Sequence, residues 1–110
     1  MYDYISIYSQ DYSTSINKEI IEEFLLTTLK FSKDYNLEYY KEIFNQKIKL
    51  RGILANSGGN YAFNSYDEFN EINLIEIDIP NSNSTNLEDE IISIAKSIAK
   101  EYSWLIDHRE

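Results

Sequence analysis

The chain has no cysteine, one histidine, one proline and three glycines among its 110 residues. The absence of cysteine excludes disulfide scaffolds, zinc ribbons, iron–sulfur clusters and thiol nucleophiles. So few histidines and glycines leave most familiar catalytic and phosphate-binding motifs without their residues. Basic residues are also scarce, since ten lysines and arginines against 19 acids give a net charge of −9. Such a charge repels nucleic acid and anionic membranes and attracts basic proteins.

The residues that are present fit one globular domain. Hydrophobic residues make up 43% and aromatic residues 15% of the chain, which is too apolar for a disordered segment. The opening Met1-Tyr2-Asp3-Tyr4 lacks the basic residue and apolar run of an export signal, and no stretch has the length of a transmembrane helix. We therefore expect a single domain over 1–110 that works in the cytoplasm, without membrane contact.

The first half of the chain carries both strand and helix patterns. Strict alternation of isoleucine with polar or tyrosine residues predicts a strand over 2–9. Apolar residues at helical spacing predict a helix over 16–31. The next stretch fits either structure, because helical spacing overlaps with strand-like alternation. We expect a short helix over 37–46 and then a strand over 47–55.

The second half carries two further strands and a helix. Glycines and asparagines at 56–60 are typical of a turn, so 61–64 is expected to return as the second strand of a hairpin. Isoleucines alternating with acids predict a strand over 72–79, with an irregularity in its early part. A Thr-x-x-Glu capping box then precedes apolar residues at steps of four and three, which predicts a helix over 86–106.

This order of elements predicts an α+β domain. The expected sheet is mostly antiparallel with about four strands, and two main helices pack on one of its faces. No linker, internal repeat or low-complexity segment interrupts the pattern.

Catalytic and metal-binding patterns are weak. The single histidine, His108, lies in the charged tail 107–110, where solvation is expected rather than the rigid cleft that catalysis needs. The acidic run near residue 70 lacks the Asp-x-Asp-x-Asp-Gly pattern of a calcium loop. Ser57-Gly58-Gly59 lacks the lysine of a phosphate-binding loop and fits a hairpin turn. We expect no catalytic residue, no metal and no cofactor.

Charge is distributed unevenly along the chain. The segment from Gly52 to Ala95 contains eight acids and no lysine or arginine. A patch of one sign steers association with a partner of the opposite sign. The acids at 88–90 also fit the first turn of a helix, where they stabilise it. The expected partner-binding residues are the other five acids and two neighbouring tyrosines: Asp67, Glu68, Glu71, Glu76, Asp78, Tyr61 and Tyr66.

Several features together give the chain a family resemblance. They are the strand Tyr4-Ile5-Ser6-Ile7-Tyr8 before the helix 16–31, the acidic segment Tyr66–Asp78, and the final helix 86–106. In these features the chain resembles the small acidic immunity proteins of bacterial contact-dependent growth inhibition and related polymorphic toxin systems. The resemblance implies an inhibitor, not an enzyme, that binds a cognate toxin domain, commonly a basic nuclease. Inhibition would come from covering the toxin's active site or substrate surface.

Two alternative functions remain open. One is a phage-type inhibitor or nucleic-acid mimic that blocks a host DNA- or RNA-binding protein, which genomic context would distinguish. The other is a small enzyme that uses paired carboxylates, for which a deep cleft with two converging acids would be evidence. For the immunity protein we expect a monomer with a protein partner and no direct nucleic-acid binding.

Overall fold

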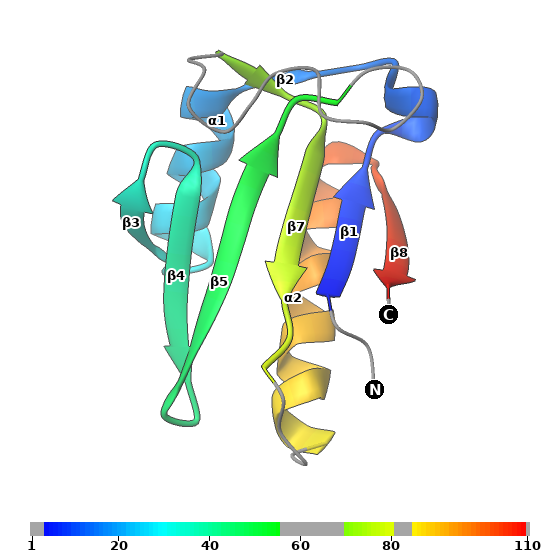
Figure 1. Ribbon diagram of the computed structural model, residues 1–110. Helices are drawn as coiled ribbons and strands as arrows, with labels where there is room; N and C mark the ends of the chain where they lie inside the picture. The colour runs from blue at the N-terminus through cyan, green and yellow to red at the C-terminus, as the bar shows by residue number, and fades with distance from the viewer. Residues whose placement is uncertain (1–3, 56–69, 81–84, 110) are drawn as a thin grey trace.

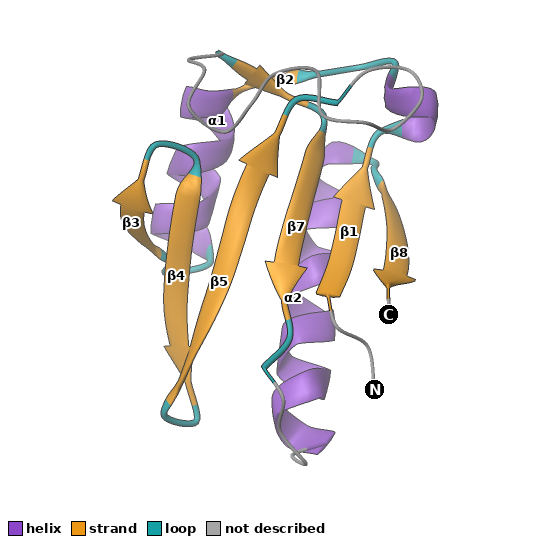
Figure 2. Ribbon diagram, viewed as in Figure 1, coloured by secondary structure: helices purple, strands orange, loops and turns teal. Residues whose placement is uncertain are grey.

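The computed structural model describes residues 4–55, 70–80 and 85–109 of the chain (Figure 1). Its main feature is a six-stranded antiparallel sheet with strand order β3-β4-β5-β7-β1-β8. Helices α1 and α2 lie behind this sheet in the view of Figures 1 and 2. No helix within the described ranges combines the length and hydropathy that a bilayer crossing requires. The α+β class is confirmed, but the sheet has six strands rather than four.

The sheet strands are β1 (Tyr4–Tyr8), β3 (Ser32–Tyr35), β4 (Glu38–Ile43), β5 (Gln46–Ile53), β7 (Leu74–Asp78) and β8 (Leu105–Arg109). A separate two-stranded ladder joins β2 (Ile16–Asn17) to β6 (Glu71–Ile72). The helical segments are the 3-10 turn η1 (Gln10–Tyr12), α1 (Lys18–Glu23), its π-helical continuation η2 (Phe24–Thr28), and α2 (Thr85–Tyr102).

The first strand forms as its alternation predicts. Ile5 and Ile7 are fully buried against the helix layer, whereas Tyr4 and Tyr8 lie half-buried on the other face. β1 lies between β7 and β8 and is hydrogen-bonded to both. The predicted strand over 72–79 is divided at Asn73, whose buried side chain accepts a hydrogen bond from the Ala55 amide at 2.8 Å. The expected early irregularity is therefore a break between β6 and β7.

The start of α1 and the end of α2 are each fixed by identifiable residues. The Asn17 side chain caps α1 by accepting a hydrogen bond from the Glu19 amide at 2.8 Å. The apolar stripe of α2 is confirmed, because Ile91 and Ile98 are fully buried. This helix ends at Tyr102, since Ser103 adopts a φ of 57° and the Trp104 amide donates back to the Ala99 carbonyl at 2.9 Å.

Three sequence expectations were wrong in this region of the fold. The first helix begins at Lys18 and not at 16, because the two preceding residues form β2. The final helix does not continue to 106, because residues 105–109 form the edge strand β8. β3 was missed because its four residues are all exposed and show no apolar alternation.

The expected helix over 37–46 was also wrong. These residues form β4 and the tight turn into β5, since Ile43 is paired with Gln46. Tyr39 and Ile43 are buried on the core side, at a strand-like spacing. The helix prediction relied on the spacing of Tyr40 and Phe44. Tyr40 lies on the opposite face of β4, and Phe44 lies in the turn. The expected turn at 56–60 and strand at 61–64 lie outside the described residues.

Candidate functional site

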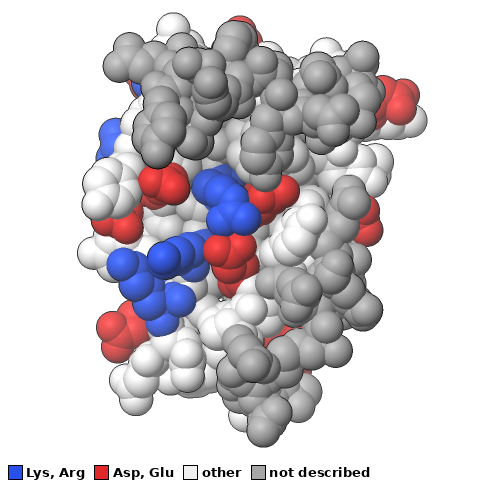
Figure 3. All heavy atoms as spheres, viewed as in Figure 1, with Lys and Arg blue, Asp and Glu red and all other residues white. Residues whose placement is uncertain are grey.

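The face of the sheet turned away from the helices carries rows of charged side chains. Alternate residues of a strand point to opposite faces, and the apolar residues that intervene on β4, β5 and β7 belong to the core. Across the strands, Arg51 is paired with both Glu38 and Glu76, and Lys49 is paired with Tyr40. Figure 3 shows lysine and arginine gathered on this side with acids around them. We call it the charged face, formed by Glu38, Tyr40, Glu42, Lys47, Lys49, Arg51, Glu76 and Asp78.

Arg51 is at the centre of the charged face. Its Nε donates to Glu76 Oε1 at 3.1 Å, and its second terminal nitrogen lies 3.0 Å from the same oxygen. Its first terminal nitrogen donates to Asp78 Oδ2 at 3.1 Å. Burial alone would lower the pKa of Arg51, but the two carboxylates raise it above its usual value. The guanidinium is therefore permanently charged and holds both acids in place.

This cluster changes the electrostatics expected from the sequence. Glu76 and Asp78, two of the predicted partner-binding residues, lie together on β7. Both form ion pairs with Arg51. Glu76 is only 7% exposed, so little of it is accessible to a partner. The basic residue comes immediately before the segment that lacks lysine and arginine. Pairing of β5 with β7 partly compensates a charge that looked uncompensated along the chain.

The other predicted binding residues are not part of the charged face. Glu71 belongs to β6, and its Oε1 accepts a hydrogen bond from the Ser15 hydroxyl at 2.8 Å. It is exposed, in a different ladder from Glu76 and Asp78. The four remaining predicted residues lie outside the described part of the chain: Tyr61, Tyr66, Asp67 and Glu68.

The strand expected over 47–55 is confirmed as β5 (Gln46–Ile53), but its basic residues were not among the predicted binding residues. Lys47, Lys49 and Arg51 alternate with core residues, so all three lie on the charged face. Lys47 lies 3.8 Å from Asp34 and 4.6 Å from the centre of the Tyr40 ring. Within the described ranges no carboxylate lies within ion-pair distance of exposed Lys49. The sequence feature that could have identified this basic surface is the alternation of lysine and arginine with apolar residues over 47–51.

A shallow hollow lies beside Arg51, where β3, β4 and β5 meet. Its volume is about 110 Å³, and both acidic and basic side chains line it. Tyr35 stands at this hollow with 67% of its surface exposed. A space of this size holds a few atoms, such as the end of a partner's side chain. The residues around it are Asp34, Tyr35, Glu38, Tyr39, Lys49, Leu50 and Arg51.

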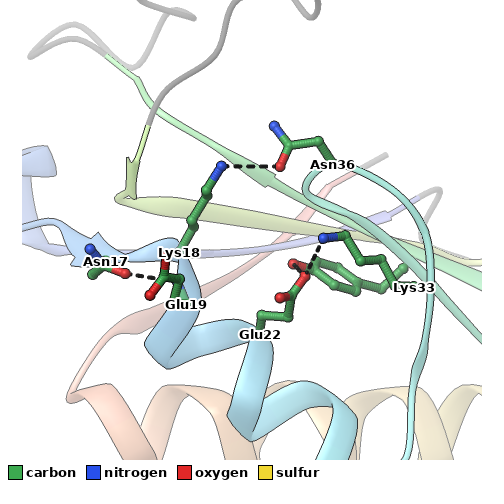
Figure 4. Close-up of polar contacts among 7 residues, drawn as sticks. Asn17, Lys18, Glu19, Glu22, Lys33 and Asn36 are labelled. Atoms are coloured by element: carbon green, nitrogen blue, oxygen red, sulfur yellow. Dashed lines mark hydrogen bonds and ion pairs between the residues drawn. The ribbon is translucent and has the colours of Figure 1, made fainter.

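A second polar cluster joins α1 to the first hairpin on the helix side. Lys33 Nζ lies 2.9 Å from Glu22 Oε1, and the Tyr39 hydroxyl donates to the same oxygen at 3.1 Å. Figure 4 shows Glu22 on α1 facing Lys33, while Lys18 Nζ reaches Asn36 at 3.3 Å. The Lys33 bond lowers the pKa of Glu22, against partial burial, and the Tyr39 bond lowers it further. Burial and the Glu22 charge raise the pKa of Tyr39. These contacts fix α1 on the sheet.

Metal-binding geometry is not found in the part of the chain that the structure describes, where no three histidine or acidic side chains converge. In comparisons with known proteins, the chain matches no family model, no curated protein sequence and no solved structure. The interpretation of the charged face therefore rests on its own geometry and chemistry.

Proposed function

We propose that the chain is an immunity protein that binds and neutralises a cognate toxin domain, a basic nuclease, by covering its active site or substrate surface. The observation that carries the proposal is the charged face. Three neighbouring strands present acids, bases and a tyrosine on one broad surface, where the described residues line a hollow of about 110 Å³. Such a surface suits contact with another protein better than enclosure of a small substrate.

The arrangement of the acids favours a binding protein over a carboxylate enzyme. Acid–base catalysis by paired carboxylates needs two acids that are free to exchange protons with a substrate. On the charged face Glu76 and Asp78 converge on Arg51, which makes hydrogen bonds to both. An acid that accepts hydrogen bonds from a guanidinium is held in a fixed position, which suits recognition of a partner.

Recognition would combine long-range steering with prepared contacts. The net charge of −9 attracts a basic nuclease, and exposed carboxylates take the place of the phosphates that it normally binds. Arg51 holds Asp78 in position before the partner arrives, which lowers the entropy lost on binding. Tyr35 and Tyr40 supply aromatic area beside these charges.

Co-purification with the product of the neighbouring gene tests the proposal. An immunity protein should form a stable complex with that product, block its activity and protect cells that produce it. Association should slow at high salt because exposed charges are screened beyond about 8 Å at physiological ionic strength. Absence of a complex, or a complex that leaves the toxic activity intact, would refute the proposed function.

A matched pair of variants locates the interface. Glu38→Gln with Glu42→Gln removes two exposed acids from the charged face, and Glu23→Gln with Glu101→Gln removes two exposed acids from the helices. Both double variants change the net charge equally. We expect only the first to slow association several-fold. Equal effects would show that overall charge, and not the charged face, governs binding.

A further inference from the structure

The turn between β4 and β5 contains an unusual residue for its backbone conformation. Ile43 is paired with Gln46, so the turn consists of Phe44 and Asn45, with φ values of 51° and 66°. Hairpin turns with two positive φ values are dominated by asparagine, aspartate and glycine. Asn45 fits this preference. Phe44 does not, because a bulky side chain in the left-handed region crowds the backbone.

Packing within the fold does not compensate this conformation. The Phe44 side chain is 60% exposed and belongs to neither of the two apolar clusters of the described residues. A single exposed apolar residue is ordinary on a protein surface. Here the exposure coincides with a backbone conformation that asparagine or glycine would adopt at lower cost. Both observations point away from a role for the ring in the fold itself.

We propose that Phe44 is an interaction anchor, which inserts its ring into an apolar pocket on a basic partner protein. The inference rests on the proposed function and identifies a contact within it. The turn lies at the free end of the β4–β5 hairpin (Figure 1), where the ring can reach a partner without displacing another described element. An aromatic ring with a polar surround is the usual composition of an interface hot spot.

The charges near the turn indicate the kind of partner. Glu42 and Lys47 are paired across the strands next to the turn, and Asn45 and Gln46 are exposed. The charges next to the turn therefore cancel, and the net charge of the whole chain determines which molecules are attracted to it. At a net charge of −9 a second copy and an anionic membrane are both repelled. A basic protein is attracted, and its pocket would receive the ring.

Thermal unfolding tests whether Phe44 is retained at a cost to the fold. Phe44→Asn relieves the left-handed conformation, and we expect it to raise Tm by about 4 °C. Phe44→Leu keeps an apolar, branched side chain in the same conformation and should leave Tm within about 1 °C of wild type. A Phe44→Asn variant with a lower Tm would overturn the inference, because the ring would then stabilise the fold.

Binding to the purified product of the neighbouring gene tests the anchor. Phe44→Asn should weaken affinity at least ten-fold, mainly through faster dissociation, whereas Gln46→Ala beside it should not. Unchanged affinity would overturn the anchor and leave the proposed function standing. Failure of the wild type to bind would refute the proposed function, while the Tm comparison still decides whether the ring serves the fold. If the wild type is a dimer and Phe44→Asn converts it to a monomer, the inference of a basic partner would be overturned, because the ring would then bind a second copy of the chain.

Discussion

Replacing Arg51 with methionine removes the one guanidinium that binds both acids of β7. Methionine keeps an unbranched side chain of similar length, so the change isolates the charge and its hydrogen bonds. After the substitution the carboxylate of Glu76, which is 7% exposed, no longer has a cation at 3.0 Å. Asp78 loses its contact at 3.1 Å. We expect the folded state to be destabilised without a change in its architecture.

The two ion pairs contribute unequally because their burial differs. Removing one partner of a fully buried pair costs about 3–5 kcal/mol. The Arg51 side chain is 35% exposed, so solvent screening reduces that cost. The Asp78 side chain is 43% exposed, and its pair adds no more than about 1 kcal/mol. We therefore expect a loss of about 2–3 kcal/mol in the free energy of unfolding, or about 10 °C in Tm.

Urea denaturation at neutral pH measures this loss. Lys49→Met is the matched control, because Lys49 lies on the same strand and face, is exposed, and has no carboxylate within ion-pair distance in the described part of the chain. It should change stability by less than about 0.5 kcal/mol. Adding Glu76→Gln to Arg51→Met should recover part of the loss, since the buried charge is then gone. A loss below about 0.5 kcal/mol for Arg51→Met would refute the central role given to Arg51.

Three further predictions concern the fold and the interface. Ile98→Ala should cost about 2–5 kcal/mol, since Ile98 is fully buried, and a melting temperature like that of wild type would contradict the packing of α2. The pKa of Glu22 is lowered from 4.5 in the fold, so its stabilising effect is present above that pH and lost as pH falls through the folded pKa. Denaturation of Glu22→Gln as a function of pH should therefore approach wild type in acid, and a constant difference would contradict this. Glu68→Lys with Glu71→Lys should weaken binding of the proposed toxin domain and leave Tm unchanged, and full protection of cells by this variant would remove both from the proposed interface.

Local sequence patterns were sufficient to predict the elements whose buried residues recur with a single period, either that of a strand or that of a helix. Ile5 and Ile7 alternate, and Ile91 and Ile98 share one helix face, so β1 and α2 were predictable from the sequence. The structure of residues 37–46 was not predictable in this way, because only one face of β4 is buried. The sequence spacing of four between Tyr40 and Phe44 is that of a helix, although Phe44 lies in the turn.

The charged face required the pairing of strands that are distant in sequence. Arg51 and Glu76 are separated by the segment 56–69, and nothing local to either residue indicates that β5 and β7 are neighbours. The acidic segment could be recognised from its composition, but the ion pairs between its acids and Arg51 could not. For the same reason the sequence placed Glu71 with Glu76 and Asp78, although a break at Asn73 puts them in different ladders.

The position of β1 sets the order in which the protein can fold during synthesis. β1 leaves the ribosome before both of its partner strands, since Ile5 is paired with Ile77 and His108. The sheet therefore cannot close around β1 until β8 has been synthesised. The β3–β4 and β4–β5 pairings join strands that follow each other in the sequence, so they can form while the chain is still emerging. Closure through such distant pairings should make refolding slower than in a helical bundle of equal length.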